Sequence, residues 1–64
     1  MERFIVKIGQ DVLINLGRKR AENEATVLLH ENIREAGEDI EKYEITCSID
    51  VRTEQLVCNA DKIN

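Results

Sequence analysis

The chain has 64 residues, so residues 1–64 can form only a single small domain, near the lower size limit for folding alone. Its hydrophobic and charged fractions, 42% and 34%, are typical of a globular domain and exclude a disordered chain. The net charge of −4 disfavours nucleic acid as a partner, because affinity for phosphate backbones requires clustered lysine and arginine.

Hydrophobic patterning gives no sign of a membrane or secreted protein. No apolar run is long enough to span a bilayer, and the N-terminal MERFIVKIG alternates instead of forming a signal-peptide core. Two cysteines do not make the disulfide framework of a small secreted domain. We therefore expect a cytoplasmic protein, in a bacterial host if it is phage-encoded, with no membrane partner.

The first patterned stretch is residues 3–16, RFIVKIGQDVLINL, in which apolar side chains alternate as they do in strands. Six of them fall on even positions, namely Phe4, Val6, Ile8, Val12, Ile14 and Leu16. Turn-type residues at 9–11 predict a hairpin that places all six on one face. Two alternatives stay open: a long strand bent by a bulge at Gly9, and a short helix begun by Asp11, because Leu13 also fits a helical period.

The next stretch, Ala21 to Gly37, has the only long helical period in the chain. Asn23 is the expected N-cap, and Gly37 is placed for the left-handed position that follows many helices. The predicted buried stripe consists of Ala25, Leu28, Leu29, Ile33 and Ala36.

Residues 43–63 predict a second hairpin, because two apolar series alternate with polar residues on either side of a polar loop. A loop centred on Arg52-Thr53 sets the register. It pairs Ile49 with Leu56, Cys47 with Cys58 and Ile45 with Ala60. All six side chains then share one face, so this register is well specified.

Together these elements predict an α+β fold of hairpin–helix–hairpin order (ββαββ), with one helix packed across one face of a small antiparallel or mixed sheet. A long bent first strand would change the order to βαββ. The element order, with an alternating strand that runs into AENEA at residues 21–25, resembles hairpin–helix–hairpin binding domains and small inhibitor proteins encoded by phages. This resemblance implies a binding or inhibitory role and transfers no functional residue.

No residue pattern indicates catalysis, a metal site or a cofactor. Cys47 and Cys58 are interpreted as two reduced core thiols, and the alternative is a cross-strand disulfide, which needs close Cβ atoms and oxidising conditions. His30 lies on the flank of the predicted helix and is interpreted as solvent-exposed, and one histidine without a CxxC pair leaves too few zinc ligands. We therefore expect no cofactor, no metal and no enzymatic activity, since a domain this small can hardly enclose a substrate pocket.

Three surfaces are candidates for binding. The back of the predicted helix is acidic and would contact a protein partner through Val27, Glu31, Arg34 and Glu38. Apolar residues on the outer side of the sheet would support self-association, and these are Ile5, Leu13 and Val57. The one basic run and a strand lysine would contact nucleic acid through Lys7, Arg18, Lys19 and Arg20.

These observations favour a non-catalytic protein-interaction module, a small acidic inhibitor or adaptor that binds a larger, basic protein partner. A phage-type anti-defence inhibitor, such as an anti-CRISPR, is one concrete form of it. A homodimer is also compatible with the pattern. The alternative function is a small nucleic-acid-binding or transcription-regulatory domain that uses the corner at residues 18–20, although three cations without interleaved aromatics are a weak basis for it.

Overall fold

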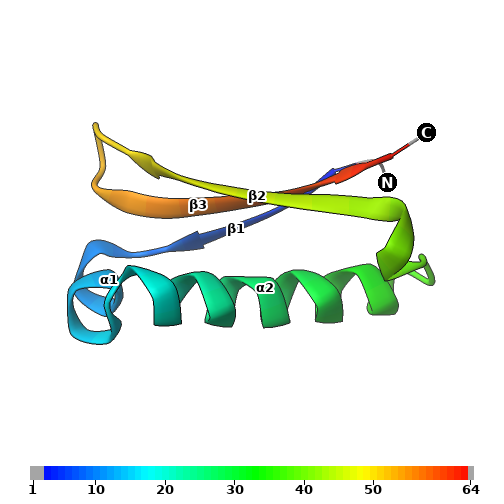
Figure 1. The fold of residues 1–64 in the computed structure, drawn as a ribbon, viewed down its shortest axis with the longest axis horizontal. Helices are drawn as coiled ribbons and strands as arrows, with labels where there is room; N and C mark the ends of the chain where they lie inside the picture. Colours follow the sequence, from blue (N-terminus) through cyan, green and yellow to red (C-terminus); the bar gives the residue numbers. More distant parts are fainter. Residues whose placement is uncertain (1–2, 64) are drawn as a thin grey trace.

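The computed structural model describes residues 3–63, so residues 1, 2 and 64 of the predicted domain lie outside the described part. Its elements in chain order are β1 (Arg3–Ile8), α1 (Gln10–Leu16), α2 (Arg18–Glu35), a 3-10 turn η1 (Ile40–Lys42), β2 (Tyr43–Asp50) and β3 (Gln55–Lys62). Figure 1 shows two layers, with the strands in one and the helices in the other. The α+β class, with a helix across one face of a small antiparallel sheet, is confirmed.

The sheet has three strands in the order β1-β3-β2, and both neighbouring pairs are antiparallel. The last strand is therefore central, and the first strand pairs with it and leaves its own outer edge free. Phe4, Ala60 and Ile45 form one row across the inner face, because Phe4 and Ile45 both lie opposite Ala60. The same alternation places the inner residues of all three strands toward the helices.

The expected second strand of the first hairpin is a helix instead. Residues 10–16 form α1, which starts directly after Gly9, and Leu13 N–H donates to the Gly9 carbonyl at 2.9 Å. Leu13 packs against the core, whereas Val12 and Ile14 are 48% and 70% exposed. The even-numbered alternation beyond Gly9 was therefore misleading, and the short-helix alternative is the correct one.

Helix α2 begins at Arg18, five residues before the predicted N-cap Asn23. Arginine and lysine are strong helix formers, so residues 18–20 extend the helix back to Gly17. Gly17 joins the two helices with φ 84° and ψ 159°, a backbone region that is almost exclusive to glycine.

The buried stripe of α2 follows an i, i+4 spacing and consists of Ala21, Ala25, Leu29 and Ile33. Two predicted members are wrong, since Leu28 is 41% exposed and Ala36 is also exposed. The prediction for Gly37 is confirmed: its φ is 74°, and its N–H donates to the Arg34 carbonyl while the next N–H donates to the Ile33 carbonyl. These two bonds are those of a Schellman motif.

The hairpin of β2 and β3 has the predicted register, with Cys47 opposite Cys58, Ile49 opposite Leu56 and Ile45 opposite Ala60. The prediction of reduced thiols is wrong, because Cys47 and Cys58 form a disulfide within this hairpin. Direct cross-strand opposition brings the two sulfur atoms close enough to bond.

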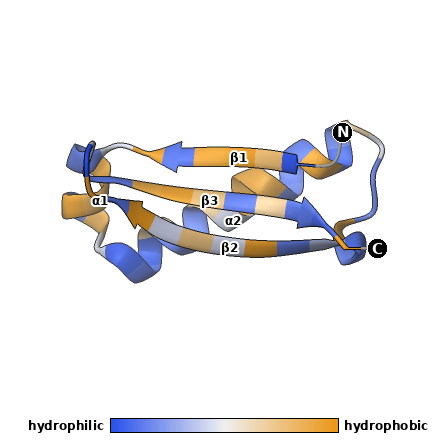
Figure 2. Cartoon of the chain, turned by 90° about the horizontal axis from the view of Figure 1, so that it is seen from above, coloured by the Kyte–Doolittle hydropathy of each residue, from blue (hydrophilic) through white to orange (hydrophobic). Residues whose placement is uncertain are grey.

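The core lies between β3 and α2, where Leu56, Cys58, Ala60 and Leu29 are fully buried. Helix α2 packs mainly against β1 and β3, so the inner side chains Ile45, Cys47 and Ile49 of β2 stay half-buried, whereas Tyr43 at the start of the strand is buried. Figure 2, coloured by hydropathy, shows hydrophobic stretches along the three strands, with α2 running beneath them. At the end of the sheet where β1 begins, the rings of Phe4 and Tyr43 pack edge to face with centroids 5.5 Å apart.

Candidate interaction surfaces

The described residues provide no obvious centre for chemistry. Within residues 3–63, no cluster of histidine, cysteine, aspartate or glutamate has the composition to hold a metal ion. His30 is half-buried on the flank of α2, less exposed than predicted. Neither described α-helix combines the length and the apolar character that a membrane crossing requires.

The open face of the sheet is the first candidate surface. We use this name for the side chains that point away from the helices, namely Arg3, Ile5, Lys7, Glu44, Thr46, Ser48, Asp50, Gln55, Val57, Asn59 and Asp61. Ile5 is 50% exposed and Val57 is half-buried on this face, as predicted. The prediction that Leu13 lies on this face is wrong, because Leu13 belongs to α1 and packs against the core on the other side of the sheet.

Charges on the open face are separated across its width. Arg3 and Lys7 lie on the edge strand β1, and Glu44 and Asp50 lie on the opposite edge strand β2. Between them on β3, Asp61 accepts from Arg3 Nε at 2.5 Å. These outer charges were not singled out from the sequence, although the alternation that predicts the inner residues also identifies the outer ones.

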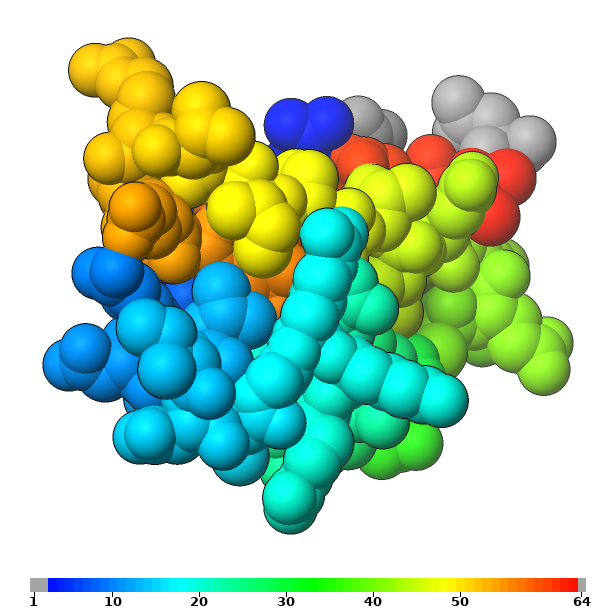
Figure 3. Space-filling model, turned by 60° about the vertical axis from the view of Figure 1, so that its left-hand side comes forward, coloured from blue at the N-terminus to red at the C-terminus, as the bar shows by residue number. Residues whose placement is uncertain are grey.

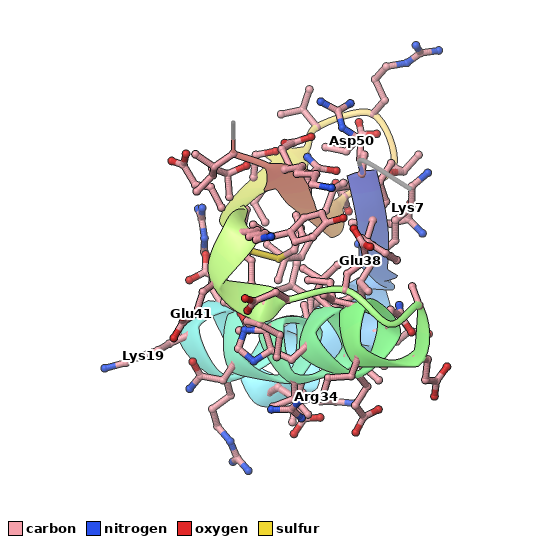
Figure 4. All side chains as sticks on the ribbon, turned by 90° about the vertical axis from the view of Figure 1, so that its right-hand side faces the viewer. Lys7, Lys19, Arg34, Glu38, Glu41 and Asp50 are labelled. Atoms are coloured by element: carbon pink, nitrogen blue, oxygen red, sulfur yellow. A yellow bond between two sulfur atoms is a disulfide. The ribbon has the colours of Figure 1, made fainter. Side chains whose placement is uncertain are left out.

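The back of α2 is the second candidate surface. Val27 is 54% exposed, and Glu31 and Arg34 are exposed beside it. Glu38, predicted to belong with them, lies after the end of the helix and points to the hairpin (Figure 4). Its carboxylate oxygen Oε1 accepts from the Tyr43 hydroxyl at 2.9 Å and lies 3.4 Å from Lys62 Nζ.

The contacts of Glu38 also affect its ionisation. The Tyr43 hydroxyl donates to the carboxylate, and the positive charge of Lys62 stabilises it further, so the pKa of Glu38 is held below its usual range. Glu38 therefore joins the helix end to the two strands of the hairpin. These contacts hold its carboxylate against the hairpin and away from the back of α2.

Acidic residues gather at the end of the molecule where α2 stops and β2 starts. We call this region the acidic end, and its carboxylates belong to Glu31, Glu35, Glu38, Asp39, Glu41 and Glu44. Positive charge at this end comes from Arg34, Lys42 and Lys62, and from Arg3, which forms an ion pair with Asp61. Figure 4 views this end and shows Arg34, Glu38 and Glu41 around the terminus of α2 and the turn that follows it.

The opposite end, formed by α1 and the start of α2, carries the basic run. Arg18, Lys19 and Arg20 occupy the first turn of α2, where positive charge opposes the helix dipole. Successive residues of a helix point about 100° apart, so the three side chains project in different directions (Figure 3). Arg18 Nε also pairs with Glu22 Oε2 at 3.0 Å.

Lys7 does not extend this basic run. It lies on the open face of the sheet, whereas Lys19 projects from the helical layer, and Figure 4 shows the two on opposite sides of the molecule. The four cations predicted for nucleic acid are thus not brought together. Val12 and Ile14 of α1 are exposed apolar side chains at the same end of the molecule as the basic run. Val51, in the loop between β2 and β3, is also apolar and is 85% exposed.

A scan of protein-family models and searches of curated proteins and of solved structures found no match to this chain.

Proposed function

We propose that the protein is a non-catalytic protein-interaction module, an inhibitor or adaptor whose acidic end binds a larger, basic protein partner. The observation that carries the proposal is the excess of carboxylates around the end of α2 and the start of β2, six against three cations apart from the ion pair of Arg3 with Asp61. Complementary charge of this kind steers association and suppresses wrong partners.

The geometry supports binding at this end because the carboxylates sit on elements with fixed positions. The N–H groups of Gly37 and Glu38 each donate a hydrogen bond to the last turn of α2, and the Asp39 side chain accepts from the Glu41 N–H at 3.0 Å. Glu38 links the same segment to the hairpin. A preorganised surface loses little conformational entropy when it binds.

The experiment is affinity capture from the native host with two variants of equal net charge. One variant neutralises the acidic end with Glu31→Gln, Glu35→Gln and Glu41→Gln. The matched control neutralises three carboxylates near the other end with Asp11→Asn, Glu24→Gln and Glu54→Gln. All six side chains are exposed, so both variants should keep the fold, which circular dichroism would check.

We expect the wild type and the control variant to capture a stoichiometric basic protein, and the acidic-end variant to lose it. Binding should weaken as salt rises, because charges on a surface are screened within about 10 Å at 0.1 M salt. The proposal fails if no stoichiometric partner is captured. It also fails if both variants lose the partner equally, since net charge and not the acidic end would then be responsible.

A further inference from the structure

We propose that two copies of this chain pack their open sheet faces together, with the two-fold axis parallel to the strands. This inference concerns the open face, which shares only Glu44 with the acidic end, and it does not rest on the proposed function. It rests on the charge pattern across the open face and on the register of the three strands.

The register places the charges in rows. Arg3, Asp61 and Glu44 share one row, because Arg3 and Glu44 both lie opposite Asp61. A two-fold axis parallel to β3 places β1 of one copy over β2 of the other and keeps each row at its own level. Arg3 of each copy then faces Glu44 of the second copy, and the dimer contains this opposite-charge contact twice.

The next rows fit the same arrangement. Lys7 shares a row with Val57 and Ser48, and Asp50 lies one row further along β2. Lys7 of one copy therefore lies over Ser48 of the other and beside its Asp50. At the axis, Val57 meets Val57 of the second copy, and the half-exposed Ile5 lies close to this pair. Asp61 also meets its counterpart, but each Asp61 is neutralised by its own Arg3.

Other symmetric arrangements place like charges together. A two-fold axis across the strands puts β1 over β1, which brings Arg3 toward Lys7 of the second copy. Antiparallel pairing of the β1 edges, centred on Ile5, sets the same two cations opposite each other. Pairing of the β2 edges, centred on Cys47, opposes Glu44 and Asp50. Like charges directly opposite in a sheet are destabilising.

The size of the face sets the strength of the dimer. The molecule measures 32 × 19 × 15 Å, and Figure 1 views it down the shortest axis with the sheet seen edge-on. The open face thus offers roughly 500 Å² per copy, which is at the low end for a specific interface and typical of weak, transient complexes. We therefore expect association only at high protein concentration.

The test uses two charge reversals, Arg3→Glu and Glu44→Arg, followed by sedimentation equilibrium up to about millimolar protein and low salt, where surface electrostatics are strongest. A dimer of the first variant would contain two contacts between carboxylates, and a dimer of the second would contain two contacts between guanidinium groups. We expect each variant alone to raise the dimer dissociation constant by about tenfold or more. An equimolar mixture of the two variants should form a heterodimer. One of its contacts joins the unmutated Arg3 and Glu44, and the other joins the two reversed side chains at the same positions. Both contacts are therefore between opposite charges.

Arg34→Glu, which reverses an exposed charge on the back of α2, is the control and should leave the dissociation constant unchanged. Recovery in the mixture cannot come from contacts within one copy, so it would establish that the contact is between copies. A wild type that stays monomeric throughout, or a mixture that does not recover, would overturn the proposal. Stronger association of Arg3→Glu alone would also overturn it, because that result fits pairing of the β1 edges.

Discussion

Residues 3–16 and residues 43–63 have the same alternating pattern, but only the second stretch forms a hairpin. Every outward position of β2 is polar, and those residues are Glu44, Thr46, Ser48 and Asp50. In the first stretch, Leu13 interrupts the polar series of residues 10–16 and packs against the core from the helix. The comparison teaches that apolar alternation alone does not distinguish a short strand from a short helix.

The two stretches should differ most in how much stability is lost when a leucine in each is replaced by alanine. Leu56 on β3 is fully buried, and Leu56→Ala should lower the free energy of unfolding by about 3–4 kcal/mol because it leaves a cavity. Leu13 on α1 is only partly buried, so Leu13→Ala should lower it by about 1 kcal/mol. Urea unfolding of both variants would measure this. Equal losses would contradict the placement of α1 at the margin of the core.

The disulfide is the second difference, because it joins the two strands of the hairpin and has no counterpart in residues 3–16. Its reduction should lower the free energy of unfolding by about 2–3 kcal/mol, since a bridge between residues 11 apart restricts the unfolded chain. Thermal unfolding with and without dithiothreitol measures this effect. The Cys47→Ser/Cys58→Ser variant should not respond to the reductant, and an unchanged wild-type midpoint would show that the bridge adds no stability.

Several features of the fold were predictable from the sequence because local chemistry determines them. The register of the second hairpin follows from its alternation, and the end of α2 follows from the glycine that can adopt positive φ at residue 37. The strand order was not predictable, because β1 presents the same alternating face to either edge of the hairpin. The state of the cysteines was not predictable either, since it depends on redox conditions as well as on position.

The candidate surfaces were predictable in part. Ile5 and Val57 lie on the open face as expected, whereas Leu13 and Glu38 do not lie where their spacing placed them. Leu13 was misplaced because one short helix was taken for a strand. Glu38 was misplaced because a helical period was continued beyond Gly37, where the chain turns back. The error at Glu38 arises at an element end, where one residue changes the direction of the side chains that follow.

The corner at Gly17 is what allows residues 10–16 to fold back as a helix. Gly17→Ala should lower the free energy of unfolding by about 1–2 kcal/mol, because a side chain disfavours its φ of 84° even though the surrounding space is open. Gly9→Ala is the matched control: Gly9 has φ −65° and equally open space, so its effect should stay within about 0.5 kcal/mol. Similar values for the two variants in chemical denaturation would remove the argument for a special corner.

The turn of the second hairpin is stable despite one unfavourable backbone position. Glu54 has φ 57°, in the left-handed region, and its N–H donates to the Asp50 carbonyl at 2.7 Å. Glu54→Gly should raise the free energy of unfolding by about 0.5–1 kcal/mol, since glycine adopts this conformation freely. Glu54→Ala is the control for loss of the hydrogen bond from Gln10 and should not stabilise the protein. If both variants behave alike, backbone conformation is not the cause.

The smallest effect concerns the contact that joins the hairpin to the helix, the hydrogen bond from Tyr43 to Glu38. The pKa of Glu38 is lower in the folded protein than in the unfolded chain, first because of this bond and then because of Lys62. Its contribution to stability is therefore complete above the unfolded pKa and is lost as the pH falls through the lowered folded pKa. Tyr43→Phe keeps the ring that packs against Phe4 and removes only the donor.

We expect the Tyr43→Phe variant to lose less stability than the wild type between about pH 5 and pH 3, the range around the ordinary carboxyl pKa. Thermal midpoints at several pH values for the wild type, Tyr43→Phe and Glu38→Gln would measure this, and Glu38→Gln should lose the dependence that the wild type shows. Parallel pH profiles for the wild type and Tyr43→Phe would mean that Lys62 alone, or no native contact, sets the ionisation of Glu38. In that case the link between the end of α2 and the start of β2 would depend on the backbone of residues 36–43 and on the aromatic pair rather than on this carboxylate.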